Sequence, residues 1–178
     1  CRVMTELGIG DSLEHTAYPG TLSLPVDLLL KQWTEVGRGI ARAGLRKLVI
    51  FNSHGGQLGL VDQTALRLRA EEQMLVVRAS YFQFGTPPGL FDPDELAYGL
   101  HGGEVVTSLM LCLRPDLVRR HALKDFTFSE ADIGTELGPE RPVGYGWMGQ
   151  DLNPSGVCGK AARADAHRGR RLLDYLGQ

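Results

Sequence analysis

The feature that most restricts the fold of this chain is a largely apolar run that ends at a histidine among glycine-rich turn residues. The run Leu45–Phe51 leads into Asn52-Ser53-His54-Gly55-Gly56-Gln57, and an amphipathic stretch begins near Leu58. This order predicts a strand, a loop and a helix, and α/β sheets build their sites at such carboxyl ends of strands. His54 is therefore a candidate metal ligand or general base. A loop histidine bonded to the backbone would have the same sequence signature.

The segments around this block predict a parallel α/β arrangement. Helical periodicity follows Pro25 and stops near Gly44, and two buried strands are expected at Lys47–Asn52 and Met74–Ala79 with a helix at Leu58–Glu72 between them. A strand–helix–strand unit implies parallel pairing. We therefore expect one α/β domain over residues 1–178, with a mostly parallel sheet flanked by helices. Later segments are expected as follows: a loop at Tyr81–Gly99, a helix at Glu104–Leu113, an irregular stretch at Lys124–Asp151 and a helix at Ala161–Leu176.

Composition excludes several classes of protein. The 19 basic and 21 acidic side chains are interspersed, and no basic patch alternates with aromatic residues, so we expect no nucleic-acid partner. No apolar run approaches the ~20 residues that span a bilayer, so we expect no membrane role. The three cysteines (Cys1, Cys112 and Cys158) are far apart, which predicts neither a disulfide framework nor a zinc knuckle and favours the reducing cytoplasm. Cys112 is expected to be a packed core thiol.

A second polar block precedes the predicted helix at residue 104. His101-Gly102-Gly103-Glu104 places a histidine and a carboxylate at a helix N-terminus, where the dipole favours negative charge. Glu104 is thus either a functional carboxylate or a first-turn acid that stabilises the helix. Glu14-His15 forms a third cluster, which taken alone could be an ordinary turn. His121 and His167 are expected at the surface.

These candidates alone make an incomplete metal site. Catalytic zinc usually takes three protein ligands plus water, and paired-metal sites need more. From spacing alone the sequence supports an α/β protein with a polar crevice.

Four spaced blocks resemble the creatininase family of metal-dependent amidohydrolases. Gly10–Leu24 is similar to that family's G-x-S-x-E-H-x-x-F/Y-P-G-T-x-S-L, and Asn52–Gln57 resembles its N-G-H-G-G-N. His101–Ser108 is similar to its H-A-G-x-x-E-T-S, and Asp151–Gly159 to its D-x-S-x-S-G-V-x-G. The four matches occur in the family's order and run across essentially the whole chain.

The resemblance implies a creatininase-like α/β subunit that hydrolyses a small cyclic or linear amide with two divalent ions per complete subunit. Zinc, manganese or iron would be the metal, and the subunits would assemble as homo-oligomers, commonly hexamers. By resemblance His54 is a metal ligand, and His101 is the histidine that passes a proton to the leaving nitrogen. Glu104 is predicted as both a metal ligand and a catalytic carboxylate.

Two departures from the family pattern bear on these roles. The family's first motif, E-x-H followed by an aspartate, supplies most of the metal ligands and lies upstream of anything present here. We therefore expect the chain to be the C-terminal portion of a longer family domain, with an open sheet edge and exposed apolar surface. Val106 stands where the family has the glutamate of E-T-S, and Glu104 would substitute for it only from a non-helical first turn.

These departures keep two functions open. The first is a metal-dependent amidohydrolase, and the alternative is a non-catalytic relative that retains the fold and the subunit contacts. A nucleotide binder of Rossmann type is a more remote third reading, because no G-x-G-x-x-G follows a strand.

Overall fold

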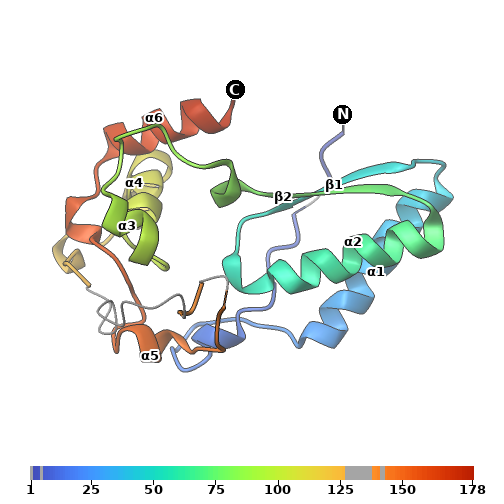
Figure 1. Cartoon of the computed structure of the whole chain (residues 1–178), viewed down its shortest axis with the longest axis horizontal. Helices are drawn as coiled ribbons and strands as arrows, with labels where there is room; N and C mark the ends of the chain where they lie inside the picture. The colour runs from blue at the N-terminus through green and yellow to red at the C-terminus, as the bar shows by residue number, and fades with distance from the viewer. Residues whose placement is uncertain (1, 5, 127–137, 141–142) are drawn as a thin grey trace. The chain divides into compact units, whose positions relative to one another are not determined.

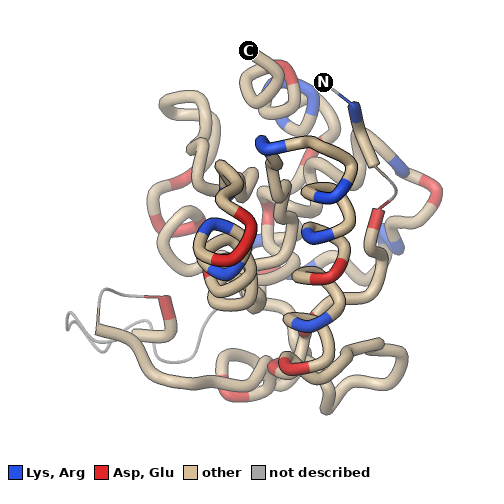
Figure 2. The backbone as a smooth tube through the Cα atoms, turned by 90° about the vertical axis from the view of Figure 1, so that its right-hand side faces the viewer, with Lys and Arg blue, Asp and Glu red and all other residues tan. Residues whose placement is uncertain are grey.

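The computed structural model describes residues 2–4, 6–126, 138–140 and 143–178. The chain divides into two compact units, residues 1–84 and residues 85–178, and each unit is described by itself (Figure 1). Acidic and basic residues are interspersed along the described backbone of both units (Figure 2). None of the described helices is both long enough and apolar enough to cross a bilayer. Cys1 lies outside the described residues. So do residues 127–137, 141 and 142 of the predicted irregular stretch Lys124–Asp151.

The first unit is a parallel strand pair with two helices. Its elements are α1 (Val26–Arg42), β1 (Lys47–Asn52), α2 (Leu58–Glu72) and β2 (Leu75–Ser80). The strands pair in parallel from Lys47 opposite Leu75 to Asn52 opposite Ser80. The predicted bounds of β1 and α2 are confirmed. Strand β2 begins one residue later than predicted, because the backbone N–H of Met74 still donates to Leu68 O at the helix end.

The two faces of this strand pair differ sharply. On one face Leu48, Ile50 and Val76 pack against buried residues of α1 and α2, among them Leu29 and Leu68. Successive side chains of a strand point to opposite faces, so the alternate residues face away from these helices. Those residues are apolar and exposed: Val49 is 55% exposed, Phe51 68%, Leu75 55% and Val77 46%.

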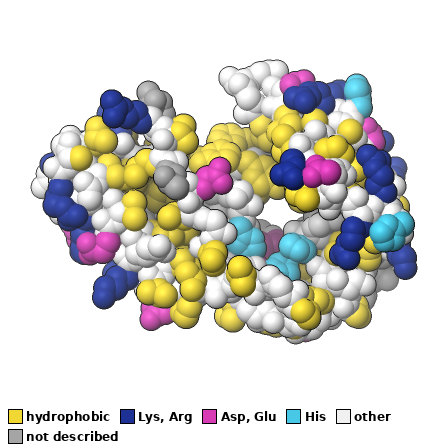
Figure 3. All heavy atoms as spheres, turned by 180° about the vertical axis from the view of Figure 1, so that it is seen from behind, with side chains coloured by type: hydrophobic (Ala, Val, Ile, Leu, Met, Phe, Trp, Pro, Cys, Tyr) yellow, Lys and Arg dark blue, Asp and Glu magenta, His cyan; other side chains and the backbone are white. Residues whose placement is uncertain are grey.

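The prediction of two buried strands is therefore wrong. Among the described residues, α1 and α2 cover one face, and the other face carries apolar side chains to the surface. Hydrophobic side chains are visible at the molecular surface in Figure 3. The expectation of exposed apolar surface agrees with this face.

The second unit is mainly helical. It contains α3 (Pro93–Tyr98), α4 (Glu104–Leu113), α5 (Gly149–Leu152) and α6 (Ala166–Leu176). Helices α4 and α6 pack closely, since a Cβ on Gly169 would lie 2.0 Å from Ser108 O. Buried Leu90, Phe91 and Leu172 form the core beside them.

Three sequence expectations for residues 81–178 need correction. The predicted loop at residues 81–99 contains a 3₁₀ turn (Tyr81–Phe84) and helix α3. The predicted final helix begins at Ala166, because the Asp165 side chain accepts from the N–H groups of His167 and Arg168 and caps the helix there. Cys112 is half-buried, whereas Cys158 is the buried thiol. Helix α4 has the predicted bounds, and His121 and His167 are exposed as predicted.

The chain thus has an α/β fold, with a parallel pair of strands and flanking helices.

Candidate functional site

A cluster of largely buried titratable side chains in the first unit centres on Glu14. Its Oε1 lies 2.8 Å from His54 Nε2 and 3.1 Å from His15 Nδ1. The side chains are largely buried, with 13% of Glu14, 9% of His15 and 30% of His54 exposed. Of the sequence candidates, the structure thus joins the Glu14-His15 block to the His54 block. The partly exposed imidazole of His54 is the member of the cluster most open to a ligand.

Two glycines allow the segments to approach this closely. A Cβ on Gly56 would lie 2.5 Å from Glu14 Oε1, and a Cβ on Gly10 would lie 2.2 Å from Gln57 Oε1. The Asp11 N–H also donates to Gln57 Oε1 at 3.3 Å. A side chain at position 56 would displace the Glu14 carboxylate from its place beside His54, and one at position 10 would displace the amide of Gln57.

Asn52 orders the turn that carries His54. Its amide Nδ2 donates to His54 O at 2.8 Å and to Ser80 Oγ at 3.1 Å. Its Oδ1 accepts from the His54 N–H at 3.2 Å and from Gln57 Nε2 at 2.8 Å. Asn52 and Ser80 are the last residues of β1 and β2, so the turn is fixed to the carboxyl ends of both parallel strands. The sequence placed the site at this edge, and the structure confirms where the strand ends.

The Glu14–His54 contact shifts both pKa values toward the charged forms. Burial raises the pKa of Glu14, but hydrogen bonds from His54 and from the backbone outweigh it, so that this pKa lies below its ordinary value. Hydrogen bonding to Glu14 raises the pKa of His54, against the opposing effect of burial. The pair is therefore a carboxylate beside an imidazole with an increased affinity for its proton.

These donors suit a divalent metal but do not complete a site. An imidazole nitrogen and a carboxylate oxygen are ligands of zinc and manganese. Within the described parts of the chain, however, no three histidine, cysteine, aspartate or glutamate side chains are placed to hold a metal ion together. The described residues thus provide part of a metal site at most.

In the second unit, the backbone of His101 pairs with Cys158. The His101 N–H donates to Cys158 O at 3.3 Å, and the Cys158 N–H donates to His101 O at 2.7 Å. This bridge fixes the His101-Gly102 backbone immediately before α4.

Glu104 is the first residue of α4, and its side chain is fully buried. Its carboxylate forms an ion pair with Arg168 of α6. Glu104 therefore lies within the helix, so the non-helical first turn that its substitution for the family glutamate would require is not present. Val106, two residues on, is partly exposed on the same helix.

The sequence did not indicate Glu95, a second buried carboxylate beside Glu104. Glu95 is 2% exposed and accepts from the backbone N–H groups of Glu104 and Lys160, both at 2.6 Å. Burial raises the pKa of Glu95 above its ordinary value, although hydrogen bonds from the backbone N–H groups of Lys160 and Val105 oppose the shift. Cβ atoms on Gly99, Gly103 and Gly159 would all lie within 3 Å of a Glu95 carboxylate oxygen. The three glycines were visible in the sequence, but their common neighbour was not.

In a comparison with known proteins, residues 1–178 match the family described as "Creatininase: Creatinine amidohydrolase". A mycofactocin precursor peptide peptidase of Mycobacterium tuberculosis (strain ATCC 25618 / H37Rv) is 30% identical over 167 residues, covering 94% of this chain and 59% of that protein. A creatinine amidohydrolase of Pseudomonas putida is 36% identical over 130 residues, covering 65% of this chain and 50% of that protein. The chain thus spans between 50% and 59% of the length of these relatives.

Solved structures of creatininases resemble the chain in fold. A manganese creatininase superposes with a TM-score of 0.69 at 27% identity, covering 89% of this chain and 63% of that one. A mutant creatininase of the Zn-Zn type superposes with a TM-score of 0.66 at 26% identity, covering 89% of this chain and 63% of that one. The fold class predicted from the sequence is confirmed by these likenesses.

Proposed function

The chain belongs to the creatininase family, and from that premise we propose that it serves the metal-dependent hydrolysis of a C–N amide bond in a small cyclic or linear amide. The observation that carries the proposal is the contact of Glu14 with His54 at the carboxyl edge of the strand pair. Its relatives are hydrolases, one a creatinine amidohydrolase and one a peptide peptidase, so the assay below includes a cyclic amide, a linear amide and a peptide.

His54 is the proposed metal ligand, and Glu14 is the residue that positions it. Histidines that bind metals commonly donate their other ring N–H to a carboxylate, which fixes the tautomer and the ring orientation. Glu14 holds Nε2 of His54 at 2.8 Å, so coordination by His54 would use the other ring nitrogen. Zinc or manganese bound there, with ligands beyond His54, would supply an activated water and polarise the amide carbonyl.

His101 is the proposed proton donor to the leaving nitrogen. Its backbone is hydrogen-bonded to that of Cys158, which fixes the position from which the imidazole side chain extends. Protonation of the amine as the C–N bond breaks is general acid catalysis. For Glu104 to act as a ligand or catalyst, as its position in the motif suggests, Arg168 must first release its carboxylate.

The buried ion pair of Glu104 and the valine at position 106 favour one alternative, a relative that retains the fold without catalysis. The two functions separate in a single comparison. Substitution Val106→Glu raises turnover if the site is catalytic and lacks this carboxylate, and it leaves turnover at zero if the chain is not an enzyme.

The direct test is metal-dependent turnover. Metal-stripped chain is reloaded with zinc or manganese and incubated with creatinine, a formamide and a short peptide, and the hydrolysis product of each amide is measured. We expect turnover that disappears with a chelator and with His54→Ala. Exposed His167 gives the matched control, because His167→Ala removes an imidazole from α6 without touching this cluster. Equal rates in the two histidine variants would overturn the assignment of His54.

The family resemblance also leads us to propose a homo-oligomer, with a hexamer as the expected state. Light scattering of the purified chain measures this directly.

A further inference from the structure

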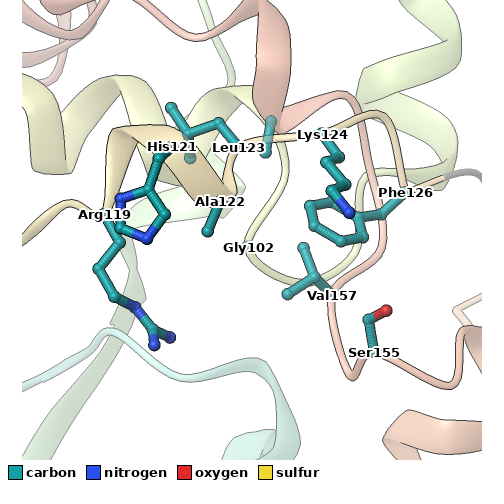
Figure 4. Close-up of a pocket in the computed structure, with 10 residues that line it drawn as sticks. Gly102, Arg119, His121, Ala122, Leu123, Lys124, Phe126, Ser155 and Val157 are labelled. Carbon is teal, nitrogen blue, oxygen red and sulfur yellow. The ribbon is translucent and has the colours of Figure 1, made fainter.

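A cavity of about 520 Å³ opens in the second unit, and two of the four family-like blocks form its walls (Figure 4). Gly102, from the His101 block, lines it together with Ser155 and Val157, from the Asp151–Gly159 block. The third wall is the segment between residues 119 and 126. The proposed proton donor His101 directly precedes Gly102, so the cavity lies next to a residue with a proposed catalytic role.

The backbone holds these three walls together. Phe126 N–H donates to Gly159 O at 2.9 Å, and Gly159 N–H donates to Phe126 O at 2.8 Å. The Cys158–His101 bridge joins the same strand segment to the His101 block. A Cβ on Gly102, which has a φ of +67°, would lie 3.1 Å from Val157 Cγ1. The walls are thus fixed by backbone hydrogen bonds and a close glycine contact, as a preformed site requires.

The described polar side chains that line the cavity include basic residues and no acidic ones. Arg119, His121 and Lys124 supply nitrogen donors, and none of the described residues that line the cavity is acidic. These three side chains form no ion pair with any described carboxylate, whereas Arg114, Lys160, Arg163 and Arg168 are all paired in the same unit. Three nitrogen donors around one hollow, none paired with a described carboxylate, favour a ligand oxyanion.

The positions of the side chains add an apolar requirement. In Figure 4, Arg119 and His121 lie on one side of the cavity, and Lys124, Phe126 and Val157 lie on the other. Ser155 presents a hydroxyl at the same rim. A ligand that spans the hollow would place its anionic group beside Arg119 and His121 and its apolar body beside the ring of Phe126, where Lys124 adds a second positive charge.

We propose that this cavity binds an oxyanion, a carboxylate or a phosphate, that the amide substrate carries beside an apolar or aromatic group. Arg119 and Lys124 are the specificity-determining residues, and Phe126 contacts the apolar part. That the oxyanion belongs to the substrate rests on the proposed function. Binding of the oxyanion to the cavity does not rest on it.

The test compares ligands that differ in charge alone. N-acetylphenylalanine, its neutral amide N-acetylphenylalaninamide, and phenyl phosphate are titrated into the 178-residue chain without added metal, with binding measured by calorimetry and by NMR shifts. We expect the acid to bind about fivefold more tightly than the amide, as solvent-exposed charge pairs allow, and this preference to shrink as salt is raised. Tighter binding of phenyl phosphate than of the acid would identify phosphate as the anion, and the reverse would identify carboxylate.

Matched variants locate the binding. Arg119→Gln and Lys124→Gln should each reduce the affinity for the acid roughly threefold to fivefold, and the double variant should bind acid and amide equally. Arg170→Gln removes the same charge from an exposed position of α6 outside the cavity and should change nothing. Equal affinity of the wild-type chain for acid and amide, or an unchanged preference in the double variant, would overturn the proposal.

Turnover measured alongside separates this proposal from the proposed function. Loss of the anion preference in the double variant, together with hydrolysis of a neutral amide by the wild-type chain and by Arg170→Gln, supports both. Anion binding without hydrolysis of any amide would leave the cavity assigned and would count against the enzyme alone.

Discussion

The two His-Gly-Gly blocks of this chain look alike in sequence but lie in opposite environments. At the first, Glu14 and His54 pair in a partly exposed cluster, and both groups are shifted toward their charged forms. At the second, Glu104 is fully buried against Arg168, and its backbone N–H is held by a second buried carboxylate, Glu95. The first arrangement leaves an imidazole open to a ligand, whereas the second uses its carboxylates to hold helices together.

The difference shows that a carboxylate near a glycine-rich turn cannot be assigned a role from the sequence alone. Its role depends on the groups that its side chain contacts. Glu14 contacts side chains that can exchange protons or bind a metal. Glu95 accepts from backbone N–H groups that cannot leave, so its replacement should damage the fold first. The predictions below test whether the second block is structural and the first is functional.

The largest expected effect comes from closing the space around Glu95. In Gly159→Ala, the new Cβ would lie 2.7 Å from Gly103 Cα and 2.9 Å from Glu95 Oε1, at a φ of +136°. We expect a loss of about 3 kcal/mol or more in the free energy of unfolding, measured by urea denaturation. The control is Gly89→Ala, which has a φ of +69° with nothing within 4 Å and should cost about 1–2 kcal/mol. Equal losses in the two variants would show that the close packing around Glu95 does not contribute to the stability of the fold.

The next effect comes from stripping Glu104 of its partner. Arg168→Met leaves a buried carboxylate unpaired, which should cost about 3 kcal/mol in the free energy of unfolding. Adding Glu104→Gln should recover part of that loss, because the buried charge is then gone. Arg170→Met, at an exposed position on the same helix, should cost less than about 0.5 kcal/mol. Additive losses in the double variant would mean that the two side chains do not interact.

A smaller change in stability but a clear change in metal binding is expected at the first block. Glu14→Gln keeps the shape of the side chain, so the free energy of unfolding at neutral pH should change by about 1 kcal/mol or less. Zinc affinity should fall about 10- to 100-fold, because the carboxylate no longer orients His54. Isothermal titration with zinc measures the second quantity. An unchanged zinc affinity would show that Glu14 does not orient His54 for metal binding.

The smallest effect is a divergence of two carboxyl pKa values. A ¹³C NMR titration should place the pKa of Glu14 below its usual 4.5 and that of Glu95 above it. The lowered pKa of Glu14 contributes stability that is present above pH 4.5 and is lost as the pH falls through the folded-state pKa. The raised pKa of Glu95 acts in the opposite sense, because its contribution declines as the pH rises from 4.5 through the folded-state pKa. Shifts in the same direction would contradict the contrast between the two blocks.

Local patterns in the sequence predicted much of the first unit. Strand β1, helix α2 and the parallel pairing followed from apolar periodicity and from the glycine-rich turn, which are properties of neighbouring residues. The exposed face of Phe51 and Val77 did not follow, because burial depends on which elements cover a face rather than on the strand itself. The contact of Glu14 with His54 was also missed, since it joins segments that are distant in the chain and is permitted by the small size of Gly56.

Glu95 shows the same boundary in the second unit. Its role depends on Lys160, on the first N–H of α4 and on glycines from two separate segments, and no local pattern links them. The predicted roles of His101 and Glu104 came from resemblance, and they remain predictions. Of the two, Glu104 now has a physical condition attached, namely the opening of its ion pair with Arg168.

The most direct test of the account is a zinc titration of the metal-free chain, followed through the ring nitrogens of its five histidines by long-range ¹⁵N–¹H NMR. We predict that the His54 ring responds at the lowest zinc concentration, with a change of tautomer or protonation, and that Glu14→Gln weakens this response. Exposed His121 and His167 should respond only at higher zinc. A His54 ring that stays unchanged while the exposed histidines titrate would contradict the claim that the Glu14–His54 pair belongs to a metal site.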